Sequence, residues 1–369
     1  MLDPVVRFFE RIFDAIGRFI GYIVAAILWP FVALTTWVRK RGFIIKGVFS
    51  LIIIGIVASY GYMIYQTQFW RGFNPDYATT YAFDQRTTKP GQPTPGAEGQ
   101  CGPSAIVEMA ADLTDFNVNQ NGWVPSMLPY KLGFFGIDWK YTPYFDNKAA
   151  FQLGVHEMVR RSNFEAKERL GRVRGTSQID QNLQNAHQNS NYNENYWYFE
   201  LSPFGPKTPT PSEYRSSINN LKAFNTRLAS CDALFDPRAD NLLRFLDQMA
   251  NALGSTSDIL GDQMEASNAG WFDLRADDRF WFTYGQLYAL NGIMAAARAD
   301  FGDVIEERNL TAVWNKMQAE LRSTLEIDPL IVSNGSESAF MMPSHLATMG
   351  FYLLRVRTNM AEMRDILDR

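Results

Sequence analysis

The sequence predicts a mainly α-helical protein, in which N-terminal membrane-anchor helices precede an all-α periplasmic helical bundle with aromatic-rich loops. First, residues 47–65 are nineteen uncharged and mostly apolar residues, long enough to cross about 30 Å of hydrocarbon as a helix. Second, apolar residues recur at intervals of three and four in most segments after residue 212, as on one face of a helix. Third, β-rich stretches of any length are missing, which argues against a sheet protein.

Residues 1–65 are predicted to form three membrane-associated helices. Residues 1–18 place charged side chains on one face and apolar side chains on the other, which is typical of an amphipathic helix on a membrane surface. Residues 19–38 are twenty uncharged residues with Pro30 among them, so this apolar, kinked helix is either half-inserted or spanning. Residues 43–65 form the transmembrane helix.

The distribution of charge predicts the orientation of the chain. Arg39, Lys40 and Arg41 directly precede the transmembrane helix, and such basic flanks stay on the cytoplasmic side. We therefore expect a bacterial inner-membrane protein with the bulk of its chain in the periplasm. The first 69 residues carry seven basic and three acidic residues, whereas the rest carry 28 and 36. An acidic body excludes nucleic acid as a partner, because phosphate contacts need a positive surface.

The remainder divides into a linker and a helical domain. Residues 66–100 end in a run rich in Pro and Gly, which predicts a linker, and residues 101–369 are predicted to be the periplasmic helical domain. Residues 117–147 are predicted to be an ordered, aromatic-rich loop. From Leu346 to Leu367 the apolar residues follow heptad spacing, which predicts a packing helix or a coiled-coil contact between subunits. Helical periodicity predicts helices over about 147–170, 212–231, 238–254, 276–302, 310–326 and 344–368.

Two stretches of the domain have nearly the same sequence, FDPRADN from Phe235 and FDLRADD from Phe272. Each directly precedes an apolar-periodic helix, and an Asp at a helix start accepts hydrogen bonds from free backbone N–H groups. A divalent metal is the alternative, but neither copy has the spacing of a calcium loop and each Arg would repel a cation. We therefore predict no metal site and a structural, helix-entry role for Asp236, Arg238, Asp240, Asp273, Arg275 and Asp277.

The two cysteines of the chain, Cys101 and Cys231, allow three interpretations. In an oxidising compartment a disulfide between them is the simplest one, and two free or buried thiols are the second. Alternatively, CGPS from Cys101 enters a predicted helix, and this resembles the nucleophile region of papain-like bacterial peptidases, where the helix start lowers the thiol pKa. Cys101 would then act with His156 or His187. His156 lies in a predicted helix, however, whereas those enzymes place the histidine on a strand.

Several longer phrases carry a resemblance to a known family. They are FDPRADN, GWFDLRADD, RGTSQID, FNTRLA and HLATMGFYLLRVRT. With the anchor, they make the chain similar to an uncharacterised family of proteobacterial inner-membrane proteins, over roughly residues 120–369. The resemblance implies an envelope protein. It implies no reaction, cofactor or catalytic residue.

The function expected from the sequence is that of a non-catalytic scaffold or partner subunit of a cell-envelope assembly. The alternatives are a periplasmic cysteine hydrolase with Cys101 as nucleophile, or a module that binds lipid or cell-wall fragments. The partners expected are membrane lipid, other inner-membrane or periplasmic proteins and a further copy of the chain, and no cofactor is expected. Aromatic and Arg side chains favour interfaces, so the residues predicted for interaction are Trp123, Trp139, Arg355 and Arg357.

Overall fold

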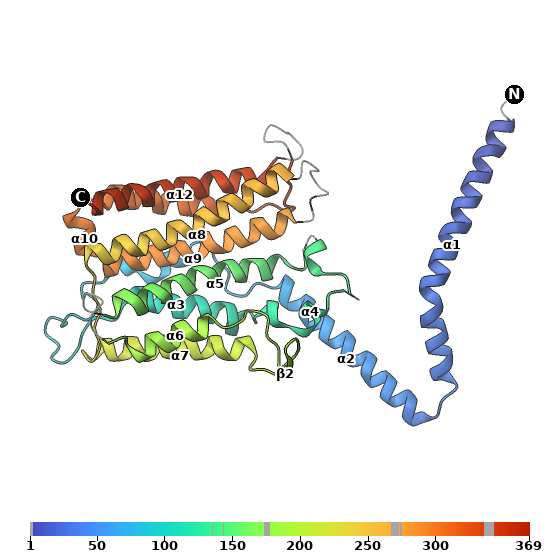
Figure 1. Ribbon diagram of the computed structural model, residues 1–369, viewed down its shortest axis with the longest axis horizontal. Coiled ribbons are helices and arrows are strands. Elements are labelled where there is room, and N and C mark those ends of the chain that lie inside the picture. The colour runs from blue at the N-terminus through green and yellow to red at the C-terminus, as the bar shows by residue number, and fades with distance from the viewer. Residues whose placement is uncertain are drawn as a thin grey trace. The chain divides into compact units, whose positions relative to one another are not determined.

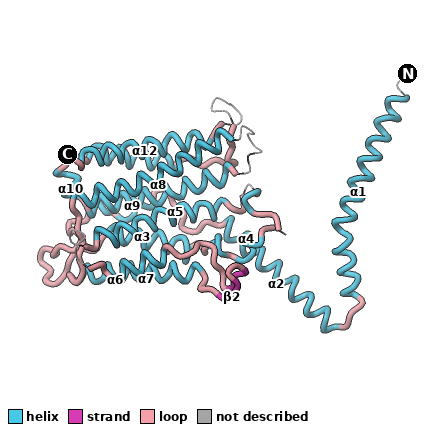
Figure 2. The backbone as a smooth tube through the Cα atoms, viewed as in Figure 1, coloured by secondary structure: helices cyan, strands magenta, loops and turns pink. Residues whose placement is uncertain are grey.

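The protein is mainly helical and divides into two compact units, Met1–Tyr62 and Met63–Arg369. The second unit is called the body below. The computed structural model describes residues 3–134, 136–142, 144–172, 178–266, 273, 275–335 and 343–369. The mainly helical fold predicted from the sequence is confirmed (Figures 1 and 2).

The first unit contains α1 (Asp3–Arg39) and most of α2 (Phe43–Gln68). Residues 1–38, predicted as two helices, form one helix from Asp3 with a bend of 41° between its Gly17–Ala26 and Leu28–Arg39 parts. Pro30 explains the position of the bend, because a proline ring clashes with the carbonyl four residues earlier, here that of Ala26. The amphipathic helix predicted for residues 1–18 depends on where its side chains lie, and most of those side chains are outside the described part of the structure.

Helix α2 is long and apolar enough to cross a membrane. Its 26 residues correspond to a length of about 39 Å. The bent pair in α1 meets the same criteria of length and composition when it is taken as one span. Arg39, Lys40 and Arg41 lie where α1 ends and before α2 begins, as the sequence predicts for the flank of a transmembrane helix.

The body is a bundle whose long helices begin and end within a few residues of the predicted bounds, apart from α8, which continues twelve residues further, to Ala266. Its α-helices are α3 (Ala105–Asp115), α4 (Leu128–Leu132), α5 (Asn147–Glu165), α6 (Gln181–Ser190), α7 (Thr210–Ala229), α8 (Ala239–Ala266), α9 (Ala276–Asp300), α10 (Gly302–Glu307), α11 (Thr311–Leu325) and α12 (His345–Leu367). A short hairpin pairs β1 (Phe199–Leu201) with β2 (Phe204–Pro206) in antiparallel register. Helix α6 was not predicted, and Asp180 caps its start by accepting from the backbone N–H of Asn182 at 2.9 Å.

The helices form layers around the central pair α5 and α9 (Figure 1). Helices α8 and α12 pack against each other on one side of this pair, and α3, α6 and α7 lie on the other. The apolar heptad residues of α12, from Leu346 to Leu367, are buried in the body. They therefore belong to a packing helix of this bundle, which was one of the two interpretations of the sequence.

Two glycines let α5 and α9 approach closely. A Cβ added to Gly154 of α5 would overlap the carbonyl oxygen of Phe282, and one added to Gly285 of α9 would overlap that of Phe151. The helices run parallel, because Asp146 at the start of α5 meets Asp278 in the first turn of α9. The starts of both helices therefore lie side by side.

Residues 66–100, predicted as a linker, belong to the body. They contain the 3₁₀ helices η1 (Tyr77–Tyr81) and η2 (Phe83–Gln85). Trp70 packs against Phe151 and Trp281 at centroid distances of 4.9 and 5.2 Å, and Tyr77 stacks on Tyr288 at 4.4 Å. The prediction was wrong for the first half of this segment, because its aromatic residues fill space between the long helices.

The end of α2 is built into the body. Met63 is fully buried, and Thr67 is nearly so. The buried Lys148 at the start of α5 donates from Nζ to the carbonyl oxygens of Gln66 and Phe69, both at 2.7 Å. A lysine is well suited to this place, because the last carbonyls of a helix have no partner within it and carry partial negative charge.

Candidate functional site

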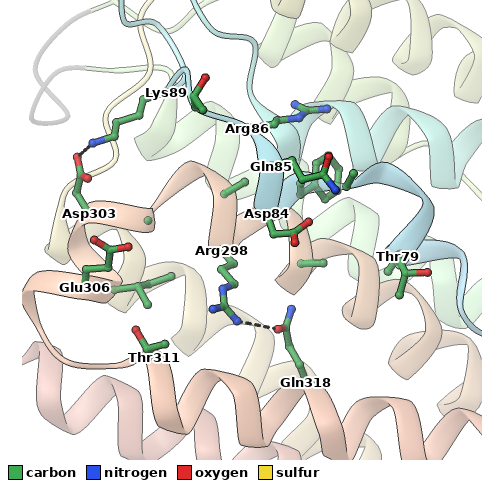
Figure 3. Close-up of a pocket in the computed structure, with 18 of the residues that line it drawn as sticks. Thr79, Asp84, Gln85, Arg86, Lys89, Arg298, Asp303, Glu306, Thr311 and Gln318 are labelled. Atoms are coloured by element: carbon green, nitrogen blue, oxygen red, sulfur yellow. Dashed lines mark hydrogen bonds and ion pairs between the residues drawn. The ribbon is translucent and has the colours of Figure 1, made fainter.

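A groove on the body is the candidate functional site (Figure 3). It has a volume of about 660 Å³, which is within the range of small-molecule sites. One wall is formed by residues 78–89, which include η1 and η2, and the other by the end of α9 with α10 and α11. The wall from residues 78–89 lies within the segment that the sequence predicted as a linker, so sequence analysis did not identify this groove.

The groove is lined mainly by polar and charged side chains. Lys89 forms an ion pair with Asp303 across it, and Arg298 donates to Oε1 of Gln318 at 3.4 Å (Figure 3). Asn291 lines the groove although only 3% of it is exposed. Its side-chain amide is not among the buried polar groups of the described residues that lack a partner. Because Asn291 lines the groove, its amide can bond water or a polar ligand there.

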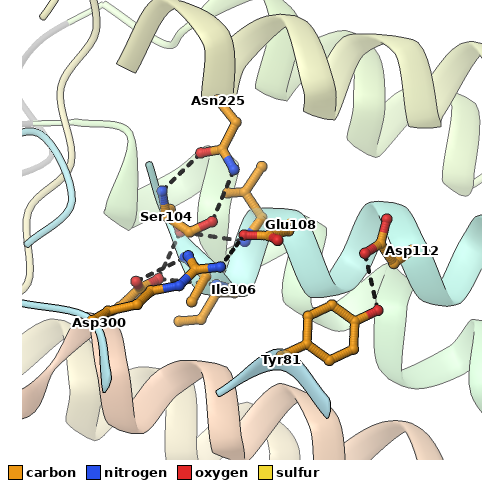
Figure 4. Close-up of polar contacts among 10 residues, drawn as sticks. Tyr81, Ser104, Ile106, Glu108, Asp112, Asn225 and Asp300 are labelled. Atoms are coloured by element: carbon orange, nitrogen blue, oxygen red, sulfur yellow. Dashed lines mark hydrogen bonds and ion pairs between the residues drawn. The ribbon is translucent and has the colours of Figure 1, made fainter. Parts of the chain in front are cut away.

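A polar network behind the groove holds the start of α3 (Figure 4). The carboxylate of Asp300, at the end of α9, accepts from Ser104 Oγ at 2.6 Å and from the backbone N–H groups of Ala105 and Ile106 at 2.8 and 3.0 Å. Asn225 of α7 bonds both backbone groups of Ser104. Burial raises the pKa of Asp300 to about 6, although these donors act in the opposite direction. The network joins α3, α7 and α9.

Two further pairs link the groove wall to α3. Arg86 forms an ion pair with Glu108 at 2.6 Å. Tyr81 donates its hydroxyl to Asp112 at 2.9 Å (Figure 4). Burial and the neighbouring carboxylate raise the pKa of the Tyr81 hydroxyl above its usual range, so this tyrosine is a hydrogen-bond donor at neutral pH and has no role as a base.

The two cysteines are joined. Cys101 and Cys231 form a disulfide that links the start of the helical domain to the end of α7, with the two Cα atoms 5.3 Å apart. A disulfide sulfur is no nucleophile, so the alternative of a cysteine hydrolase that uses Cys101 is wrong for this structure.

His156 is a core residue. Its Nε2 lies 2.8 Å from the carbonyl oxygen of Ser190, and its ring stacks on Tyr214 at 4.2 Å. Burial, with a smaller contribution from Arg160, lowers the pKa of His156 to about 3, which keeps the imidazole neutral. His187, the other histidine considered as a partner for Cys101, lies in α6 with Nε2 3.1 Å from the side-chain amide of Asn191.

The first of the two similar stretches, FDPRADN from Phe235, leads into α8. Arg238 donates from Nε to both carboxylate oxygens of Asp236, at 2.9 and 2.8 Å, and its Nη2 lies 3.5 Å from Asp240. Asn241 donates to the carbonyl oxygen of Asp236 at 2.8 Å. These contacts join the loop to the first turn of the helix without any ligand.

The second stretch, FDLRADD from Phe272, precedes α9, and its aspartate Asp273 has hydrogen-bond partners that differ from those of Asp236. Phe272 and Leu274 lie outside the described residues. Asp273 accepts from the side chains of Gln263 at 2.9 Å and Asn334 at 2.7 Å. It also accepts from the backbone N–H of Arg275 at 3.2 Å. Asp273 therefore ties the end of α8 and the segment before α12 to the start of α9. Asp277, in the first turn of α9, is buried.

Three carboxyl groups gather where α5 and α9 begin, and sequence analysis did not bring them together. Asp146 is fully buried, both of its carboxylate oxygens lack a hydrogen-bond partner among the described residues, and the carboxyl groups of Asp277 and Asp278 lie close enough to affect its pKa. Burial, followed by the charges of Asp278 and Asp277, raises the pKa of Asp146 well above its usual range. Burial also raises the pKa of Asp277 to about 7. Two parallel helix starts favour negative charge, but they do not offset the loss of water around three carboxyl groups.

This cluster makes stability depend on pH. A carboxyl group whose pKa is higher in the folded than in the unfolded state stabilises the fold at low pH, and that stability is lost as the pH rises through the folded pKa. We expect the stability of the wild-type fold to fall as the pH rises from about 4, the ordinary carboxyl pKa, to about 7, the folded pKa of Asp277. The slope is about 1.4 kcal/mol per pH unit for each carboxyl group that is protonated in the folded state and ionised in the unfolded state.

Asp146→Asn, which keeps the size of the side chain and removes its ionisable group, should make this slope shallower. Near-UV circular dichroism of the full-length protein during thermal unfolding at several pH values measures it. The control is Asp258→Asn at an exposed position of α8. An unchanged slope in Asp146→Asn would contradict the assignment.

The residues predicted for interaction fall into two groups. Trp123 and Trp139 are each only 2% exposed, and they donate to the carbonyl oxygens of Glu194 at 2.7 Å and Pro129 at 3.0 Å. They are core residues, and their prediction as interaction residues was wrong. An aromatic-rich loop has the same composition whether its rings face the solvent or the core.

Arg355 is at the surface, where it pairs with Glu320 and lies 5.3 Å from the ring centre of Phe351. The guanidinium of Arg357 packs 3.1 Å from the position of a Cβ on Gly254, so it contacts α8. No group of three or more His, Cys, Asp or Glu side chains suited to a metal ion occurs in the part of the chain that the structure describes.

These features define a helical body with a polar groove, preceded by a helix of membrane-spanning length and composition. The chain belongs to a family described as uncharacterized proteins conserved in bacteria (DUF2333), whose model matches residues 126–270 and 262–369. This confirms the resemblance to an uncharacterised bacterial family. The chain matches no curated protein and no solved structure.

Proposed function

We propose that the protein is a non-catalytic scaffold or partner subunit of a cell-envelope assembly, anchored in the bacterial inner membrane with its helical body in the periplasm. The observation that carries the proposal is the junction at residues 63–73. Lys148 holds the end of α2 through two hydrogen bonds, and Trp70 and Phe73 pack on Phe151 of α5. A simple tether needs no such junction, because a flexible linker holds a domain at a membrane equally well.

The orientation rests on the basic residues before α2. Arg39, Lys40 and Arg41 would stay on the cytoplasmic side, which leaves the body on the opposite side. The disulfide Cys101–Cys231 supports this assignment, because such bonds persist in the periplasm and are rare in the cytosol.

An exposed apolar pair on α12 supports a binding role. Phe351 and Leu354 are 54% and 46% exposed, and the guanidinium of Arg355 lies beside Phe351. Aromatic residues and Arg are enriched at protein interfaces. A second copy of the chain or another envelope protein could bind here.

The test is purification of the tagged full-length protein from native membranes in mild detergent, followed by mass determination of the intact assembly. We expect a homo-oligomer or a constant set of partners in fixed stoichiometry, which Phe351→Glu with Leu354→Glu should release. The matched control is Ile259→Glu, a 40% exposed residue on α8. A monomer without partners would overturn the scaffold proposal.

The groove favours a second candidate function, the binding of a lipid headgroup or a cell-wall fragment. The side chains of Asn291, Arg298 and Arg322 line it, and together they suit a polar ligand with anionic groups. A ligand that stays with the wild-type protein through purification and is lost in Asn291→Leu would favour this function over the scaffold.

A further inference from the structure

An exposed apolar surface lies on the body beside the residues through which the chain enters it. We name it the interfacial patch, and it consists of Leu132, Phe134, Ile137, Tyr198, Leu201 and Phe204. Leu201 and Phe204, at the turn of the β-hairpin, are 80% and 79% exposed. Exposed apolar groups gathered in this way on a soluble surface mark a contact with a partner or a membrane.

The two parts of the interfacial patch are joined to each other. Lys131 of α4 forms an ion pair with Glu200 of β1, so the end of α4 and the hairpin are neighbours. Glu200 also accepts from the backbone N–H of Trp197 at 2.8 Å, which fixes the base of the hairpin. Figure 1 shows α4 and β2 at the same end of the bundle, opposite to α10.

The same end of the body carries the last residues of α2. Gln68 donates from Nε2 to the carbonyl oxygen of Tyr144 at 3.1 Å. A Cβ on Gly122 would lie 3.4 Å from the Gln66 side chain and 3.5 Å from Met127, which precedes α4. The entry point of the chain and the interfacial patch are therefore close together on one face.

The length of α2 determines how far this face can be from a bilayer. The apolar run ends at Tyr65, and Gln68 follows about 4.5 Å further along the helix. The headgroup layer on each side of the hydrocarbon is about 5–7 Å thick. If α2 spans the membrane, Gln68 and the neighbouring Tyr144 lie at the level of the headgroups.

We infer that the interfacial patch is immersed in the outer headgroup region of the bilayer that α2 crosses, so that the body is held against the membrane at two places. The inference rests on the proposed membrane insertion of α2. Its occupant is lipid, and the side chains suit it. Tyr198, Phe204 and Leu201 offer aromatic and apolar groups, and Lys140 and Lys207 lie beside tyrosine rings at 5.2 and 5.7 Å. Tyrosines with lysines that reach the headgroups are typical of the membrane interface.

The test uses the full-length protein in nanodiscs whose lipids carry a nitroxide near the headgroup. Both native cysteines form the disulfide, so one added cysteine is a unique site for a fluorescent label. Leu201→Cys reports on the interfacial patch, and its exposure means that the substitution leaves the core intact. Glu307→Cys, at the end of α10, is the control at the opposite end of the bundle (Figure 1). Ile53→Cys reports on α2.

We expect the labels at Leu201→Cys and Ile53→Cys both to be quenched, the first more strongly because it lies at the level of the nitroxide, and the label at Glu307→Cys to keep its fluorescence. If Ile53→Cys is quenched and Leu201→Cys is not, α2 is inserted in the membrane but the interfacial patch does not contact lipid, which overturns this inference. If neither is quenched, the proposed membrane insertion fails as well. Quenching of all three labels would also overturn the inference, because it would not distinguish this face from the rest of the body.

Discussion

Replacement of Asp300 by alanine is expected to destabilise the body by about 4 kcal/mol, because it removes the acceptor of three buried hydrogen bonds at once. Ser104 Oγ and the backbone N–H groups of Ala105 and Ile106 would lose their partner. The donors lie at the buried start of α3, where water cannot replace the carboxylate. A lost donor–acceptor pair of this kind costs about 1–3 kcal/mol for each orphaned group.

The measurement is chemical unfolding of the full-length protein in detergent, followed by near-UV circular dichroism. Asp303→Ala is the matched control. It lies three residues further along the chain, and it loses only its ion pair with Lys89, in which both side chains are more than one third exposed. That loss should cost less than about 1 kcal/mol. Equal effects of the two substitutions would contradict the role assigned to Asp300.

The second large effect is expected from Gly154→Ala, which should cost more than about 3 kcal/mol. The added Cβ would overlap the carbonyl oxygen of Phe282 and lie 2.9 Å from the backbone nitrogen of Gln286. Both atoms belong to the backbone of α9, so no side chain can move to make room. The two central helices would have to separate, and the aromatic residues packed around them would lose contact.

Gly261→Ala provides the control within another helix. Gly261 lies in α8, and a Cβ there would meet no atom within 4 Å. Alanine should therefore stabilise the helix by about 0.5–1 kcal/mol, as is usual for a glycine replaced in a helix interior. Thermal unfolding of both variants measures the difference. If Gly154→Ala unfolds at the wild-type temperature, α5 and α9 do not pack as closely as described.

Local patterns predicted the helices well. The apolar seam from Leu346 to Leu367 predicted α12 within a residue at each end, because one periodic face determines where a helix can be buried. The RAD sequences predicted the starts of α8 and α9. Helix α6 was not predicted, because its ten residues carry few apolar side chains and its start depends on Asp180.

The candidate site was much harder to predict. The groove wall consists of a segment whose composition resembles a linker, and its order comes from Phe83 and Tyr77, which pack on helices about 200 residues later in the chain. Asp146 and Asp278 are 132 positions apart, and only the parallel packing of α5 and α9 brings them together. Loop aromatics such as Trp123 were assigned to the surface because composition carries no information about which side of a loop faces the core.

The sequence by itself determined the helical class, the long apolar helix α2 with its basic flank and the positions of most long helices. These properties depend on neighbours along the chain, namely on hydrophobic periodicity, helix starts and uninterrupted apolar length. Only the tertiary structure decided that Cys101 pairs with Cys231, that His156 is buried and neutral, and that the end of α2 is held by Lys148. Burial, hydrogen bonding and pKa depend on groups that approach from distant parts of the chain, and their positions follow from the packing of the whole bundle.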